Sequence, residues 1–218
     1  MINQAEILAQ TEQYVKEKLS GEGSGHDWWH IYRVYQNARS LCRQENIDTF
    51  VVELAALLHD IGDHKFHHGD TTVGPRLARA WLTPLGVAEN TISHISEIIA
   101  DLSFKGSGVP TPMRTREGMI VQDADRLDAI GAIGIARAFA YGGHKGRLLY
   151  DPAIHPTEHH SFSAYQNSQA PTINHFYEKL LLLKERMNTP AARHLAEERH
   201  AFMEQFLTQF FAEWEGQR

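Results

Sequence analysis

A histidine and an aspartate follow one another at the end of a stretch that is apolar on nearly every side. The stretch runs from Phe50 to Leu58, and His59 and Asp60 come directly after it. A helix of this kind belongs in a protein interior, and a carboxylate near a dry region is costly unless it is paired or bound to a cation. The pair therefore predicts either part of a metal site or a simple ion pair of Asp60 with His59 or an arginine.

Three aspartates, Asp123, Asp125 and Asp128, lie within a second stretch that is otherwise apolar. Arg126 alone cannot neutralise three carboxylates, and the three positions do not share one helical face. We therefore expect at least one of these carboxylates to point inward, where it needs a partner. Gly131 continues the stretch with a small residue that would let another helix approach closely.

A third stretch contains His26 and His30, which are four residues apart and so lie on one face of a helix. The order His26-Asp27-x-x-His30 resembles a zinc-protease motif with Asp in place of Glu. We reject that interpretation because the shorter Asp reaches less far and the chain offers no convincing third ligand. Together the three stretches supply two imidazoles and two carboxylates. Such a set suits Mn²⁺, Fe²⁺, Co²⁺ or Mg²⁺ better than a structural zinc, and it leaves coordination positions open for catalysis.

The elements that must position these residues are helices, because most of the sequence has helical periodicity. We predict one all-α domain, a helical bundle over residues 1–218, with a loop over about 142–172 that lacks a convincing period. A loop of that length inside a compact domain is usually functional or mobile. The predicted helices cover about 4–19, 26–45, 49–61, 71–86, 89–100, 114–141, 173–187 and 190–214.

The composition of the chain narrows its class further. The chain has 218 residues, a formal net charge of -6 and no block of like charges, which argues against nucleic acid as an obligatory partner. Its one cysteine, Cys42, fits a reducing compartment. The polar N-terminus lacks the pattern of a signal peptide, and no apolar stretch is long enough to span a bilayer. We therefore expect a cytoplasmic protein that uses no membrane; a homodimer is compatible with the sequence.

The three motifs, in this order, resemble those of the HD-domain superfamily of metal-dependent phosphohydrolases, and in particular its small stand-alone bacterial members. The similarity covers about residues 25–141. It implies an all-helical HD-type fold and one divalent metal ion, with His30, His59, Asp60 and Asp125 as ligands. The residues that carry the resemblance are His30-x-x-Arg33, His59-Asp60 and Asp123-Ala124-Asp125-Arg126-Leu127-Asp128.

Further residues are candidates for catalysis and substrate binding. Asp63, three positions after the HD aspartate, and His26 would orient the water or take its proton. Candidates for contact with the substrate are Arg33, Lys65, His94, Lys105 and Asp128. Arg126, Lys145 and Arg147 are further cations that could face a phosphate, although Arg126 more readily pairs with Asp123 or a neighbouring helix. Trp28 and Trp29 could stack on a nucleobase, but the sequence favours core packing for both.

The resemblance implies hydrolysis of a small-molecule phosphate ester or nucleotide by a metal-activated water. A (d)NTP pyrophosphatase or a nucleotide phosphatase is our first interpretation. Hydrolysis of another phosphomonoester or of a cyclic nucleotide is the alternative within hydrolases. A di-iron oxygenase on the same fold would need more histidine ligands, for which His94 is the candidate. A non-catalytic nucleotide sensor would have no need for open metal positions.

Overall fold

In the computed structural model of the chain, helices are the regular secondary structure of the described residues, and no β-strand occurs among them. The all-α prediction is therefore confirmed. No helix in the described ranges is both long enough and apolar enough to cross a membrane. The structure describes residues 3–20, 27–43, 47–62, 70–102, 108–161, 164 and 167–217.

The chain forms two compact units. The first contains residues 1–104 and 111–125, and the second contains residues 105–110 and 126–218. The division falls within one helix, α6 (Arg116–Asp128). The expectation of a single domain stays a prediction.

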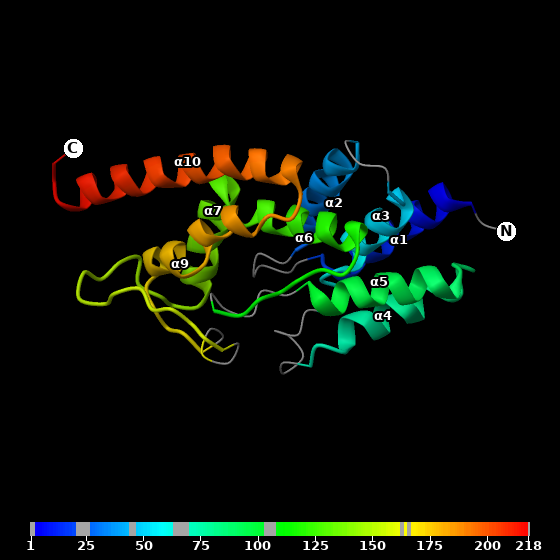
Figure 1. Cartoon of the computed structure of the whole chain (residues 1–218). Coiled ribbons are helices and arrows are strands. Elements are labelled where there is room, and N and C mark those ends of the chain that lie inside the picture. Colours follow the sequence, from blue (N-terminus) through cyan, green and yellow to red (C-terminus); the bar gives the residue numbers. More distant parts are fainter. Residues whose placement is uncertain are drawn as a thin grey trace. The chain divides into compact units, whose positions relative to one another are not determined.

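Helix α3 (Thr49–Leu58) is the central element of the first unit (Figure 1). It packs against α1 (Gln4–Lys18), α2 (Trp28–Cys42) and α5 (Glu89–Asp101), while α4 (Val73–Leu82) packs along α5. The five residues from Leu54 to Leu58 have no exposed surface. The prediction that this apolar stretch forms an interior helix is therefore confirmed.

Side-chain caps fix where two of these helices begin. The Asp48 carboxylate accepts hydrogen bonds from the Phe50 and Val51 N–H groups, at 3.1 and 3.4 Å, so Asp48 is the predicted N-cap of α3. The Asp27 carboxylate accepts from the His30 N–H at 2.9 Å. This cap starts α2 at Trp28, two residues later than the periodicity predicted.

The second unit is built from α7 (Gly131–His144), α9 (Thr172–Glu178) and α10 (Pro190–Trp214) (Figure 1). Helix α7 packs against both α9 and α10. The single helix predicted over about 114–141 is wrong, because α6 and α7 are separate helices with a break at Gly131, where φ is +75°. The helix predicted over about 173–187 is also too long, since α9 ends at Glu178 and two 3-10 turns follow.

Hydrogen bonds attach the described part of the predicted loop 142–172 to α9. The Thr172 N–H donates to the Leu148 carbonyl at 2.9 Å, and the Thr157 N–H donates to the Glu178 carboxylate at 3.1 Å. Helix α7 also extends as far as His144, so the stretch outside regular helices is shorter than predicted. Whether this loop is functional stays a prediction.

Candidate metal centre

Four side chains of the first unit converge on one point. His30 lies in the first turn of α2, His59 is the C-cap of α3, Asp60 follows it, and Asp125 lies in the last turn of α6. The Nε2 atoms of the two imidazoles are 3.2 Å apart. Oδ2 of Asp60 lies 3.3 and 3.6 Å from these nitrogens, and Oδ1 of Asp125 lies 3.5 and 3.9 Å from them.

These distances suit shared coordination of one ion. Ligand atoms about 2.1 Å from a metal lie about 3 Å apart when adjacent in an octahedron and about 3.4 Å apart in a tetrahedron. One ligand atom each of His30, His59 and Asp60 lies within 4.8 Å of the others, so this group could hold a metal ion. Asp125 adds a second carboxylate beside the same two nitrogens.

The backbone fixes which nitrogen His59 presents to the cluster. Its Nδ1 lies 2.9 Å from the carbonyl oxygen of Ala56. A carbonyl only accepts hydrogen bonds, so Nδ1 carries the hydrogen and the neutral ring presents a lone pair at Nε2. A second ring nitrogen held in this way is typical of metal-ligating histidines.

The cluster is consequently rich in acceptors. Two carboxylate oxygens and the lone pair of His59 lie within 4 Å of His30 Nε2, which can supply at most one hydrogen. A divalent cation at the centre would be attracted by both carboxylates and by the imidazole lone pairs. The donor set therefore fits a metal ion.

Exposure rises from one side of the cluster to the other. The exposed fraction of the side chain is 0% for His30 and 2% for His59, but 17% for Asp60 and 34% for Asp125. The two histidines thus form the dry side of the cluster and the two carboxylates face the solvent. Among the described residues, the carboxylate side of the cluster is therefore the more accessible side for water and a substrate.

Comparison with known proteins agrees with this arrangement. The model of the HD domain matches residues 28–130, a segment that contains all four converging residues. Bacillus subtilis YpgQ is 43% identical over 209 residues, which cover 93% of this chain and 92% of YpgQ. The chain belongs to the HD-domain family.

Solved structures of HD-domain relatives extend over the whole length of the chain. A Lactobacillus plantarum protein has a TM-score of 0.86 and 41% identity and covers 99% of this chain and 100% of its own. An HD-superfamily hydrolase from Bacillus thuringiensis has a TM-score of 0.75 and 46% identity, with 98% and 99% covered. YpgQ in complex with ADP has a TM-score of 0.75 and, with residues paired by superposition, 36% identity, with 96% of both chains covered.

His94 lies apart from the cluster in this HD domain. Its Nε2 contacts the Thr115 hydroxyl at 2.9 Å and lies 3.9 Å from the Glu117 carboxylate, at the start of α6. Asp125 is eight residues further along that helix, which corresponds to about 12 Å of rise. His94 is therefore badly placed to share an ion with Asp125, and its role with the substrate stays a prediction.

The aspartates of α6 have different environments. Asp123 and Asp128 are buried, at 0% and 1% exposure, which confirms that at least one carboxylate of this stretch points inward. Asp128 belongs to the second unit and pairs with Arg137 at 2.7 Å. Since a buried, paired carboxylate is poorly suited to touch a phosphate, the geometry supports a structural role for Asp128; substrate contact stays a prediction.

Four of the predicted cations can be located. Arg33 is half-buried on α2, three residues after His30 and hence on a neighbouring part of the helix surface. Arg126 is buried and donates to the Arg186 carbonyl, as expected for a structural residue. Lys145 and Arg147 both lie over the Tyr141 ring in the second unit. The remaining candidates lie outside the described residues, so their roles stay predictions: His26, Asp63, Lys65 and Lys105.

Two supporting contacts escaped the sequence analysis. The Asn37 side-chain amide donates to the Ala124 carbonyl at 3.3 Å, which ties α2 to α6 next to Asp125. Asn37 is seven residues after His30 and shares its helical face, so a polar residue at that spacing was an available signal. The Ala56 carbonyl that orients His59 had no signal, because a backbone group is present at every position.

A polar contact also aligns α2 with α3. The Tyr35 hydroxyl donates to the Glu53 carboxylate at 3.3 Å, and Arg39 lies 3.5 Å from the same carboxylate. Burial and the neighbouring Glu53 charge raise the pKa of Tyr35 to about 12. The two helices that carry the histidines are thereby held in register.

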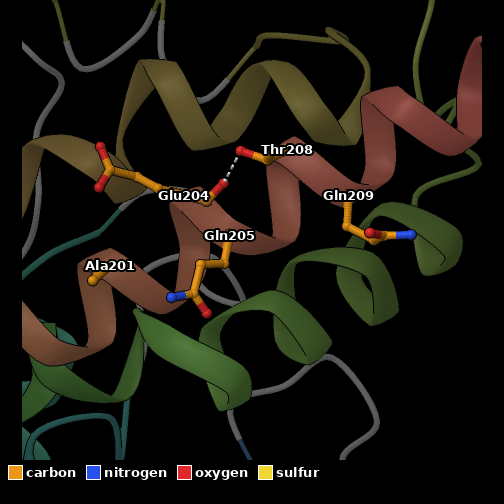
Figure 2. A pocket seen from close by; sticks show the side chains of 5 residues that line it. All are labelled: Ala201, Glu204, Gln205, Thr208 and Gln209. Carbon is orange, nitrogen blue, oxygen red and sulfur yellow. Dashed lines mark hydrogen bonds between the residues drawn. The ribbon is translucent and has the colours of Figure 1, made fainter. Parts of the chain in front are cut away.

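The second unit contains an open groove along α10 (Figure 2). Within it the Thr208 hydroxyl donates to the Glu204 carbonyl at 2.8 Å. Glu204 is its one carboxylate, and no imidazole lines it, so the groove does not offer the ligands that a metal centre needs. The residues lining it are Ala201, Glu204, Gln205, Thr208 and Gln209.

Proposed function

We propose that this HD-domain protein is a metal-dependent phosphohydrolase that acts on nucleotides, with (d)NTPs cleaved to pyrophosphate or nucleotides cleaved to phosphate. The observation that carries the proposal is the convergence of His30, His59, Asp60 and Asp125: the imidazole nitrogens are 3.2 Å apart, and a carboxylate oxygen of each aspartate lies 3.3–3.9 Å from them. These four residues would hold one divalent ion, with Mn²⁺, Fe²⁺, Co²⁺ or Mg²⁺ as candidates.

A divalent ion in such a site lowers the pKa of a coordinated water and polarises a phosphoryl oxygen. The protein's own side chains form the rest of the site. His30 and His59 form its buried side, and the Ala56 carbonyl keeps the His59 lone pair directed at the cluster. Asp60 and Asp125 bring negative charge to the solvent side, where the phosphate ester would enter.

The nucleotide part of the proposal rests on relatives. Bacillus subtilis YpgQ, which this chain matches over 96% of its length, was solved in complex with ADP. ADP combines a phosphate chain with an aromatic base, and the phosphate chain is the part that a divalent ion recognises. We therefore favour a nucleotide over a simple phosphomonoester or a cyclic nucleotide.

A di-iron oxygenase is not favoured. It would need histidines beyond His30 and His59, and His94, its candidate, contacts Thr115 and Glu117 at the far end of α6. Among the described residues the geometry groups only one set of three metal-ligating side chains that all lie close together. We thus retain hydrolysis as the proposed reaction.

The test is metal analysis of the purified protein, followed by a (d)NTP screen with added Mn²⁺ that measures phosphate and pyrophosphate separately. We expect one of the two products from wild type and none above background from Asp125→Ala. Asp101→Ala is the matched control, because Asp101 is a carboxylate of the first unit that lies at the end of α5 and pairs with Arg114. Oxygen uptake without either product would overturn the proposal, as would full turnover by Asp125→Ala.

A further inference from the structure

Helix α2 carries a polar side chain on the same face as its metal-site histidine. The helix has a covered and an open side: Trp28 is 6% exposed and Trp29 is 59% exposed, so core packing is confirmed for the first and wrong for the second. Asn37 lies seven residues after His30, nearly two full turns, and therefore on the same face of α2. It is half-buried beside Ala38, which has no exposed surface. An amide in such a place is unfavourable unless it is hydrogen-bonded.

The Asn37 amide contacts the helix that carries Asp125. Its Nδ2 donates to the carbonyl oxygen of Ala124 at 3.3 Å, and Ala124, which has no exposed surface, directly precedes Asp125 in the last turn of α6. A hydrogen bond depends on direction, whereas the hydrophobic effect does not. This bond therefore fixes α6 against α2 at the turn that carries the proposed ligand, which apolar packing alone would do less precisely.

The position of α6 decides where the Asp125 carboxylate lies. Within the described part of the chain, the polar contacts of this side chain are those with the imidazoles of His30 and His59, at 3.5 and 3.9 Å. The histidines are held in other ways as well, since the His30 N–H donates to Asp27 and the His59 ring is bonded to the Ala56 carbonyl. Metal–ligand distances tolerate only about 0.2 Å of variation, so a small shift of α6 would take Asp125 out of reach of the ion.

We propose that Asn37 is a positioning residue for Asp125: its hydrogen bond to the Ala124 carbonyl holds the last turn of α6 where the Asp125 carboxylate completes the metal ligands. The inference rests on the metal site of the proposed function. Asn37 acts on the ion through Asp125, as groups that orient a metal ligand do. Its loss should therefore lower the affinity for the metal, and the effect should require Asp125.

Calorimetric titration of the chelator-treated protein with Mn²⁺ tests this role. Asn37→Leu, which removes the donor and keeps a branched side chain, should weaken Mn²⁺ binding about 10-fold, the lower end of the usual effect for groups that orient a metal ligand. Asn37→Ala, which avoids the larger side chain, should show the same loss. Glu117→Ala is the matched control and should keep the wild-type affinity. It removes a contact of the first turn of α6, where the Glu117 carboxylate accepts from the Asp48 N–H at 3.4 Å.

A double-mutant cycle separates action through Asp125 from a general disturbance of α2. In the Asp125→Ala background, Asn37→Leu should cause no further loss of Mn²⁺ affinity, because the ligand that it positions is absent. A further 10-fold loss in that background (~1.4 kcal/mol) would overturn the proposal, since Asn37 would then act through His30 or through the fold as a whole.

Two other results would also overturn the positioning role. One is a wild-type affinity of both Asn37 variants for Mn²⁺, and the other is an equal loss of affinity in Glu117→Ala, which would mean that any loosening of α6 has the same effect. The proposed reaction is tested separately by turnover, so Mn²⁺ binding without turnover would refute only the reaction. Failure of wild type to bind Mn²⁺ would refute the metal site, and with it both proposals.

Discussion

Replacing Asp125 by alanine should remove the stability that a divalent ion gives to this protein. Asp125 brings a carboxylate oxygen within 3.5 Å of His30 and 3.9 Å of His59, and it is the most exposed of the four proposed ligands. An ion that binds only the folded state stabilises it in proportion to the logarithm of its concentration. The variant should therefore differ from wild type in its response to metal more than in its stability without metal.

The expected size follows from the length of the chain. At a free ion concentration 100 times the dissociation constant, binding stabilises the folded state by about 2.7 kcal/mol. The 218 residues give an unfolding entropy of about 0.46 kcal/mol/K, so Tm should rise by about 6 °C in a single transition. If the loss of Asp125 weakens binding about 100-fold, the same ion concentration should raise Tm by less than about 1 °C.

Thermal unfolding followed by circular dichroism, with chelator and then with increasing Mn²⁺, would measure both responses. In chelator we expect Asp125→Ala to be at least as stable as wild type, because the change removes one of two carboxylates that lie near the same imidazole nitrogen and repel each other. Asp101→Ala, which alters a first-unit carboxylate outside the cluster, should keep the full metal-dependent shift.

Two results would refute this reasoning. If Asp125→Ala kept a Tm shift equal to that of wild type, Asp125 would not be a ligand. If the variant lost the same stability in chelator as in metal, its carboxylate would have a packing role, and repulsion between the two carboxylates would be the wrong account of the cluster without metal.

Three further predictions concern the framework. Arg137→Ala should destabilise the second unit by about 3 kcal/mol, measured by urea unfolding, because it removes the guanidinium that donates to the buried Asp128 carboxylate at 2.7 Å. Asp128→Asn should leave kcat/KM unchanged, and a large loss of activity would restore its predicted role with substrate. Gly131→Ala should lower the free energy of unfolding by more than Gly86→Ala, for which a left-handed alanine should cost about 1–2 kcal/mol. Both glycines have φ +75°, but only a Cβ at Gly131 would meet a neighbouring side chain, at 3.0 Å; equal losses in chemical denaturation would contradict this. The pKa of Tyr35 is raised from 10.0 to about 12 in the folded state, so the unfolded chain ionises first as the pH rises. The free energy of unfolding should therefore fall by about 1–2 kcal/mol between those pH values. Tyr35→Phe should abolish this fall in a pH series of unfolding curves.

The sequence could predict the helices because their apolar residues recur with a helical period. It located α1 and α10 almost to the residue, as well as the Asp48 cap of α3. It could not locate the break at Gly131, because the apolar pattern continues through it and the positive φ depends on how the chain leaves α6. Periodicity reports which face of a helix is buried and says little about where the backbone turns.

The candidate site was predictable in part for the same reason. His59, Asp60 and Asp125 each interrupt an apolar pattern, and a polar residue in a dry place is a strong signal. For Trp28 and Trp29 the sequence contained no such signal, because two adjacent residues of the same type cannot be told apart by their pattern alone. Adjacent helical positions point about 100° apart, so one indole entered the core and the other did not.

The end of α3 explains why an adjacent histidine and aspartate can share one ion. Consecutive residues within a helix diverge, yet Oδ2 of Asp60 lies 3.6 Å from Nε2 of His59. The regular helix ends at Leu58, and Asp60 lies in the turn that follows the His59 cap. The His59 ring stays hydrogen-bonded to the last helical turn through the Ala56 carbonyl. The end of the helix thus coincides with the convergence of two neighbouring ligands, which the predicted extension of this helix to Ile61 did not anticipate.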